Sequence, residues 1–172
     1  AWYTIIVLLV AYTLAFIDRV ILSLLVEPIR RDLGISDTQM SLLHGFAFAI
    51  FYSLLGIPIA RLADRHDRRL IIGIGVAVWS LMNALCGLAR SFWEMFAARI
   101  GVGVGEAALS PAAYSIIADS FRPAQLGRAI GVYSAAIYGG AGLALIAGGT
   151  VAALASDASR IALPVVGSVF PW

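Results

Sequence analysis

Five long apolar stretches are the feature of this chain that most constrains its fold. They cover about residues 2–26, 38–60, 70–88, 93–118 and 128–155. A helix needs roughly 20 residues to cross a hydrocarbon layer about 30 Å thick, and each stretch reaches or nears that length. The sequence therefore predicts an all-α membrane protein with about five transmembrane helices.

The composition agrees with a membrane protein. Hydrophobic residues make up 61% of the 172 residues and charged residues only 13%, whereas soluble domains are about 45–50% apolar. The net charge of +2 reflects few carboxylates rather than a patch for polyanions. The expected partner is therefore the lipid bilayer and not nucleic acid. Cys86 lies in an apolar run as a small hydrophobe, and no metal or organic cofactor is expected.

Loop arginines predict how the chain is oriented. Six lie in the loops after the second and fourth stretches, and four lie in the opposite loops: Arg61, Arg65, Arg68, Arg69, Arg122 and Arg128, against Arg30, Arg31, Arg90 and Arg160. The positive-inside rule then places the 2–3 and 4–5 loops in the cytoplasm. We expect residues 1–155 to form one transmembrane bundle, with a cytoplasmic segment before it. Residues 156–172 are expected to be an outer loop or the start of a sixth span.

Four charged residues lie inside the apolar stretches: Asp18 and Arg19 in the first, Arg99 and Glu106 in the fourth. A charge at the centre of a spanning helix costs roughly 2.5–3.5 kcal/mol. Such groups persist where they pair, face a wet cavity or serve a function. One interpretation is a static ion-pair cluster that holds helices together, although a buried pair is weak evidence for stability.

Depth along the helices favours a functional interpretation. Asp18 lies roughly 12 Å, and Arg99 roughly 9 Å, from the outer ends of their spans, so the two can pair. Glu106 lies two turns deeper than Arg99 on the same face. Desolvation disfavours a charged carboxylate and a nearby arginine favours it, so a balanced group can load and release a proton. We predict Asp18 and Glu106 as proton-coupling groups, Arg99 as a charge partner, and Arg19 as free to meet an anionic substrate group.

Two motifs resemble those of the major facilitator superfamily. The loop from Ala60 to Arg69, Ala-Arg-Leu-Ala-Asp-Arg-His-Asp-Arg-Arg, is similar to the family's signature loop, although Ala60 and Asp67 stand where the family usually has glycines. The segment Arg99-x-x-x-Gly103-x-Gly105 resembles the fourth-helix motif. The resemblance covers essentially the whole chain as the N-terminal helix bundle. It implies that the C-terminal half of the same transporter is a partner.

The same resemblance implies that the loop is a cytoplasmic gate rather than a catalytic site. Its residues Asp64, Arg65, Arg68 and Arg69 match the family pattern. Asp64 would pair with the C-terminal half when the inside is closed, and Arg68 and Asp119 would form a relay pair. The alternative is a solvated run of charges that only sets topology.

A finer resemblance is to the Spinster-like branch of sphingolipid and lysolipid transporters. Phe16-Ile-Asp-Arg19 looks like its first-helix pair, and Gly103-Val-Gly-Glu106-Ala with Ile116-Ile-Ala-Asp119-Ser-Phe121 looks like its fourth helix. This implies proton-coupled transport of an amphipathic substrate by alternating access, with Asp18, Arg19 and Glu106 at the functional positions. The all-arginine, alanine-rich composition suggests a bacterial member in the inner membrane.

Other functions remain as alternatives. A transporter of a small polar solute or a drug is one, although Gly142 is followed by Leu143 and not by the proline of the antiporter motif. A channel or a non-transporting membrane protein is another, although a channel would need a repeated filter-like loop, which we do not find. An enzyme is not expected, because the chain lacks the common nucleophile and metal motifs.

Overall fold

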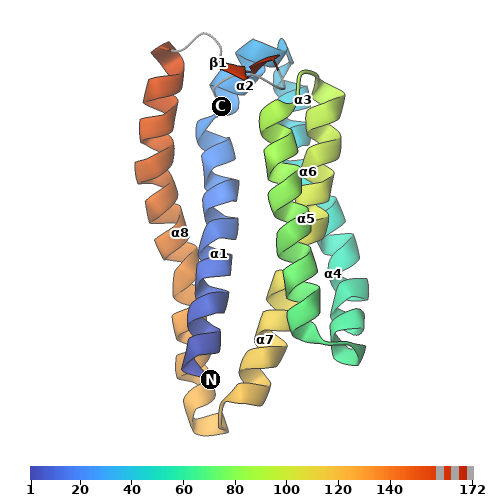
Figure 1. Cartoon of the computed structure of the whole chain (residues 1–172), viewed down its shortest axis with the longest axis vertical. Coiled ribbons are helices and arrows are strands. Elements are labelled where there is room, and N and C mark those ends of the chain that lie inside the picture. Colours follow the sequence, from blue (N-terminus) through green and yellow to red (C-terminus); the bar gives the residue numbers. More distant parts are fainter. Residues whose placement is uncertain (158–160, 164–166, 170–172) are drawn as a thin grey trace.

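The computed structural model is a bundle of long helices (Figure 1). It describes residues 1–157, 161–163 and 167–169, and the side chains of residues 1–150. Five helical segments are long and apolar enough to cross a membrane: Trp2–Leu24, Asp37–Arg65, Arg68–Leu88, Phe92–Ser120 and Pro123–Thr150. The prediction of an all-α membrane protein with about five spans is confirmed.

Several spans are built from more than one helical element. The first span is α1 (Trp2–Leu24), followed by the short α2 (Val26–Leu33). The second combines α3 (Asp37–Ser41), a π-helical turn η1 (Leu42–Phe46) and α4 (Ala47–Arg65). The others are α5 (Arg68–Leu88), α6 (Phe92–Glu106) with α7 (Leu109–Ser120), and α8 (Pro123–Asp157).

The chain crosses the bundle five times, so successive turns alternate between its ends. Figure 1 shows the N-terminus, the α4–α5 turn and the α7–α8 turn at the lower end, with α2, α3 and the α5–α6 turn at the upper end. The two loops predicted to be cytoplasmic therefore lie at the same end.

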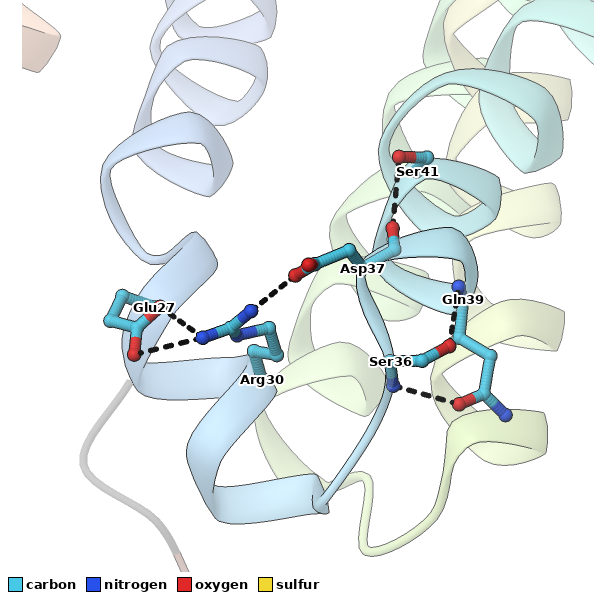
Figure 2. Close-up of polar contacts among 6 residues, drawn as sticks. All are labelled: Glu27, Arg30, Ser36, Asp37, Gln39 and Ser41. Atoms are coloured by element: carbon cyan, nitrogen blue, oxygen red, sulfur yellow. Dashed lines mark hydrogen bonds and ion pairs between the residues drawn. The ribbon is translucent and has the colours of Figure 1, made fainter.

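Polar contacts fix the chain at the upper end, where α2 meets α3 (Figure 2). Ser36 and Gln39 form a capping box, in which the Gln39 N–H donates to Ser36 Oγ over 3.3 Å and the Ser36 N–H donates to Gln39 Oε1 over 2.9 Å. Arg30 on α2 pairs with Asp37 on α3 and with Glu27 one turn earlier. The Arg30–Asp37 pair therefore joins the short α2 to the start of the second span, and the capping box begins α3.

A break in the fourth span has a local cause. Residues 107–108 form a turn between α6 and α7. Pro111 lies four residues after Ala107 and has no N–H to donate to the Ala107 carbonyl, and its ring crowds that carbonyl. The helix therefore stops directly after Glu106 and restarts at Leu109 with Pro111 in its first turn, where proline is tolerated.

Close backbone contact holds α6 against α5. A Cβ atom added at Gly105 would lie 2.6 Å from the Trp79 nitrogen and 2.7 Å from the Gly75 carbonyl oxygen. Only glycine fits at that distance, as expected where small residues let transmembrane helices approach. This contact sets the position of Glu106, the next residue of α6.

The segment after α8 contains two short strands among its described residues. β1 (Ile161–Leu163) pairs antiparallel with β2 (Gly167–Val169). The prediction that residues 156–172 form an outer loop or the start of a sixth span stays a prediction. The outer-loop prediction for 156–172 also covers 158–160, 164–166 and 170–172, which lie outside the described residues.

Candidate functional site

The buried charges of α1 and α6 meet at the centre of the bundle. Arg19 donates two hydrogen bonds to Glu106 Oε2, from Nη2 over 2.5 Å and from Nε over 2.8 Å. Glu106 is only 1% exposed, whereas the Arg19 side chain keeps 26% of its surface accessible. The expectation that Arg19 is free is therefore wrong for this structure. Successive helical residues point about 100° apart, so Arg19 faces α6 while Asp18 faces α5.

Asp18 has a different partner from the one that its depth suggested. The Asn83 side-chain amide on α5 donates to Asp18 Oδ2 over 2.6 Å. Asp18 and Arg99 do not approach within the 4.0 Å of an ion pair in the described part of the chain. They instead line the same cavity of about 200 Å³, together with Cys86 and Met95. Counting residues along each helix placed Asp18 and Arg99 at a similar depth in the membrane. It did not give the rotation of each helix about its own axis, which decides whether the two side chains face each other.

Two buried polar atoms at this site have no hydrogen-bond partner among the described residues. Arg99 is 4% exposed and its Nε is unpaired, and Glu106 Oε1 is also unpaired. A buried donor or acceptor without a partner costs about 1–3 kcal/mol, and more where the group is charged. Arg99 can therefore donate a further hydrogen bond at this site, and Glu106 can accept one.

Aromatic rings surround the Arg19 guanidinium. Its central carbon lies 5.1 Å from the Phe16 ring centroid, 4.8 Å from that of Phe48 and 5.2 Å from that of Tyr52. A ring face within about 6 Å attracts a cation through its quadrupole. Phe16 comes from α1 and the other two rings from α4, so two spans hold this cation beside a carboxylate on a third.

Asp18 also lines a larger cavity between α1 and α5. This cavity has a volume of about 860 Å³, and most of its lining is apolar. Asp18, Ser80 and Asn83 contribute the polar groups of its inner part, and Arg69 lines it as well. The carboxyl group of Asp18 therefore borders two separate cavities.

The predicted gate residues lie at the lower end of the bundle. Arg68 on α5 forms an ion pair with Asp119 on α7, so the structure brings the predicted relay pair together. Asp64, Arg65 and Arg69 are exposed around the same surface hollow of about 400 Å³. Asp67, which stands where the family usually has glycine, caps α5 by accepting from the Arg69 N–H over 2.9 Å.

The residues that sequence reasoning missed are the uncharged ones. Asn83 stood out only as an amide in an apolar stretch, and Phe48 and Phe16 have no distinguishing pattern among the other aromatics. Its place in an apolar stretch is the signal that pointed to Asn83, because an amide shielded from water needs a hydrogen-bond partner. The role of Phe48 depends on its position against α6, which no local pattern reveals.

Comparison with known proteins now places the chain. Residues 8–170 match the family model described as Major Facilitator Superfamily. The chain belongs to the major facilitator superfamily. Members of this superfamily are transporters, and an integral membrane bundle of apolar helices with buried charges fits that class.

Relatives within the superfamily include Spinster proteins. A crystal structure of a bacterial homologue of the human lysosomal transporter Spinster, inward-facing and occupied, is 44% identical, with a TM-score of 0.85 over 89% of this chain and 33% of that one. An MFS-type efflux pump of Mycolicibacterium smegmatis is 35% identical over 98% of this chain and 39% of its own length. A probable L-galactonate transporter of Escherichia coli is 35% identical over 73% of this chain and 28% of its own.

The chain thus spans about a third of the length of these relatives, and it fits the N-terminal half of a Spinster-like transporter. The resemblance found in the two motifs is confirmed. The names of the relatives cover an efflux pump, a probable sugar-acid transporter and a Spinster homologue, so they agree on transport and differ in what is carried.

Proposed function

We propose that the intact protein is a proton-coupled secondary transporter that moves an amphipathic, lipid-like substrate by alternating access, with Glu106 as the central proton-binding group. It would lie in the inner membrane of a bacterium, with the α4–α5 and α7–α8 turns in the cytoplasm. The observation that carries the proposal is the buried Glu106, whose hydrogen-bonded oxygen is held by Arg19 alone.

Protonation of Glu106 links the proton to Arg19. An ionised carboxylate holds the guanidinium through charge-assisted hydrogen bonds, which are roughly twice as strong as neutral ones. A proton on Glu106 removes the charge and weakens both bonds. Arg19 then turns its partly exposed guanidinium towards an anionic group of the substrate. When Glu106 is protonated, Arg19 is thus free to meet an anionic substrate group, as the sequence led us to expect.

Asp18 is the second proposed proton-coupling group. It borders two cavities that follow one another along the α1 face turned to α5, and its charged form is supported by Asn83. Arg99 lines the smaller cavity and is the nearest candidate to pair with Asp18 when the helices shift. The proposed sequence of states is therefore an exchange of partners among two carboxylates and two arginines.

The lining of the site favours a substrate with an apolar tail. Aromatic rings surround Arg19, and Asn83 is the amide that the structure places among the buried charges. A polyhydroxylated substrate needs several amide and acidic groups, because buried polar groups must be paired. A lysolipid, or a sphingolipid that carries a phosphate in its headgroup, suits an arginine among aromatics.

A sugar acid is a second candidate. Arg19 can bind a substrate carboxylate as readily as a phosphate, because its fork of donors matches both. The 35% identity to a probable L-galactonate transporter favours this candidate.

Reconstituted flux separates these candidates. The full-length protein in proteoliposomes is tested with a labelled lysolipid and with labelled L-galactonate, with and without an inward or outward pH gradient. We expect saturable, gradient-driven flux of the lysolipid. Flux of galactonate alone would replace the lipid substrate, and conduction without saturation would indicate a channel.

Glu106→Gln tests the proton site directly. The amide keeps the size of the side chain but cannot take up a proton, so gradient-driven flux should fall at least about tenfold, as for removal of one general acid–base group. Glu94→Gln is the matched control on the same helix, because Glu94 lies in the first turn of α6 away from the site. Proton-driven flux retained in Glu106→Gln would remove this residue from the mechanism.

A further inference from the structure

We propose that Phe48 is a positioning residue of the charge site, whose ring holds Arg19 on Glu106 and separately stabilises Arg99. This inference rests on the proposed role of Glu106 and extends it to a residue without charge. The Phe48 ring centroid lies 4.8 Å from the Arg19 guanidinium carbon and 5.6 Å from that of Arg99. One ring is thus shared by the two arginines of the site.

The position of Phe48 is fixed by the backbone of α6. Arg99, Gly103 and Glu106 are spaced by four and three residues, so they share one helix face. A Cβ atom at Gly103 would lie 2.8 Å from the Phe48 carbonyl oxygen and 3.4 Å from its Cα atom. The glycine of the family motif therefore makes room for the backbone of Phe48, directly between the levels of the arginine and the carboxylate.

Arg99 depends on this ring more than Arg19 does. Arg19 contacts three rings and a carboxylate, whereas Phe48 supplies the one ring contact of Arg99 in the described part of the chain. The Nε of Arg99 also lacks a hydrogen-bond partner. An aromatic face stabilises a desolvated guanidinium without neutralising it. Phe48 therefore stabilises the charged form of Arg99 without a carboxylate, and Glu106 pairs with Arg19.

Charged and titratable groups from every neighbouring element bear on the pH response of Glu106. Asp18 and Arg19 on α1 and Arg99 on α6 itself act on Glu106 directly. His44 on η1 and Cys86 on α5 interact with Arg99, and Tyr52 on α4 contacts Arg19. Replacing the ring of Phe48 changes none of them chemically. A shift in the pH profile on that replacement therefore reports how the ring positions them.

The experiment measures flux against pH for the full-length protein in proteoliposomes. The variants are Phe48→Leu and Phe48→Met, which fill space without a ring, and Phe48→Tyr, which keeps the ring. Phe46→Leu is the control, because Phe46 is two residues away, 51% exposed and without a ring contact to either arginine. Thermal unfolding is recorded for each.

We expect Phe48→Leu and Phe48→Met to move the pH midpoint of flux upward by about half a unit to one unit. Arg19 is held less firmly without the ring, so the carboxylate takes up its proton at higher pH. Phe48→Tyr and Phe46→Leu should keep the wild-type midpoint.

An unchanged midpoint in a folded ringless variant overturns the role of Phe48, and a lowered melting temperature with that same midpoint means that the ring only packs. If Glu106→Gln keeps proton-driven flux, the proposed function fails first and the inference fails with it. Glu106→Gln therefore tests the proposed function, and the ringless Phe48 variants test the inference.

Discussion

Glu106 uses its two carboxylate oxygens unequally. Oε2 accepts both bonds from Arg19, and Oε1 accepts none. An oxygen without a donor is where a proton adds at least cost, because no existing bond has to break. Asp18 differs, since a neutral amide supports one of its oxygens. The two carboxyl groups of the site therefore have separate local environments, although both lie within apolar stretches.

The contact between Asn83 and Asp18 gives a test at this scale. Asn83→Leu removes the donor to a partly buried carboxylate, which costs about 1–3 kcal/mol of stability when Asp18 is charged. The amide favours the charged form of Asp18, so the loss should be large at pH 8 and small at pH 5, where more of the carboxyl group is protonated. Thermal unfolding of the full-length protein at both pH values measures it.

Ser80→Ala is the control for that measurement, because Ser80 lines the same large cavity without a hydrogen bond to Asp18 among the contacts of the described residues. An equal loss of stability at both pH values in Asn83→Leu would mean that its amide acts through packing and not through the charge of Asp18.

Much of the site could be predicted from the sequence because charges are expensive in hydrocarbon. That argument found Asp18, Arg19, Arg99 and Glu106 but gave their depth alone. Pairing depends on which way each side chain points around its helix, and this is set by contacts with other helices. The same limit explains why Phe48 went unnoticed.

The elements themselves were predictable because an apolar run of about 20 residues has few alternatives in lipid. The interruptions were not. Neither the π-helical turn at Leu42–Phe46 nor the break after Glu106 interrupts the apolar pattern, although Pro111 marks the second of them locally. The span limits in the structure accordingly differ from the expected ones by a few residues.

The α5–α6 contact gives a matched pair of variants at the scale of elements. Gly105→Ala places a methyl group against the backbone of Gly75 and Trp79, and such overpacking costs about 1–3 kcal/mol. Gly101→Ala meets only the Met82 side chain, which is flexible and can move aside. We expect a clear fall in melting temperature for Gly105→Ala and little change for Gly101→Ala. Similar values for both would contradict the backbone contact.

For the whole molecule, the ion pair at the lower end is the feature with the widest proposed effect. Arg68 and Asp119 join α5 to α7, and Asp64 lies exposed beside them, where we propose that it meets the C-terminal half. Exposed pairs contribute only about 0–1 kcal/mol to stability. A role in gating, as proposed, would therefore be visible in transport rather than in unfolding.

A charge swap tests the gate. Arg68→Asp and Asp119→Arg should each lower the initial rate of flux about fivefold or more, in line with a coupling of 1–3 kcal/mol between conformational states. The double variant should recover most of the rate, because the pair is restored with reversed signs. The melting temperatures should stay near that of the wild type. Rates that follow stability, with no recovery in the double variant, would reduce the pair to a structural contact.

The interruption between α6 and α7 has one more consequence. The regular helix is interrupted directly after Glu106, where the Ala108 N–H donates to the Gly105 carbonyl three residues earlier instead of four. If Glu106 binds the coupled proton as proposed, its charge changes at the junction of two helical segments. A shift of α6 against α7 at that junction would then follow from the protonation of this one residue.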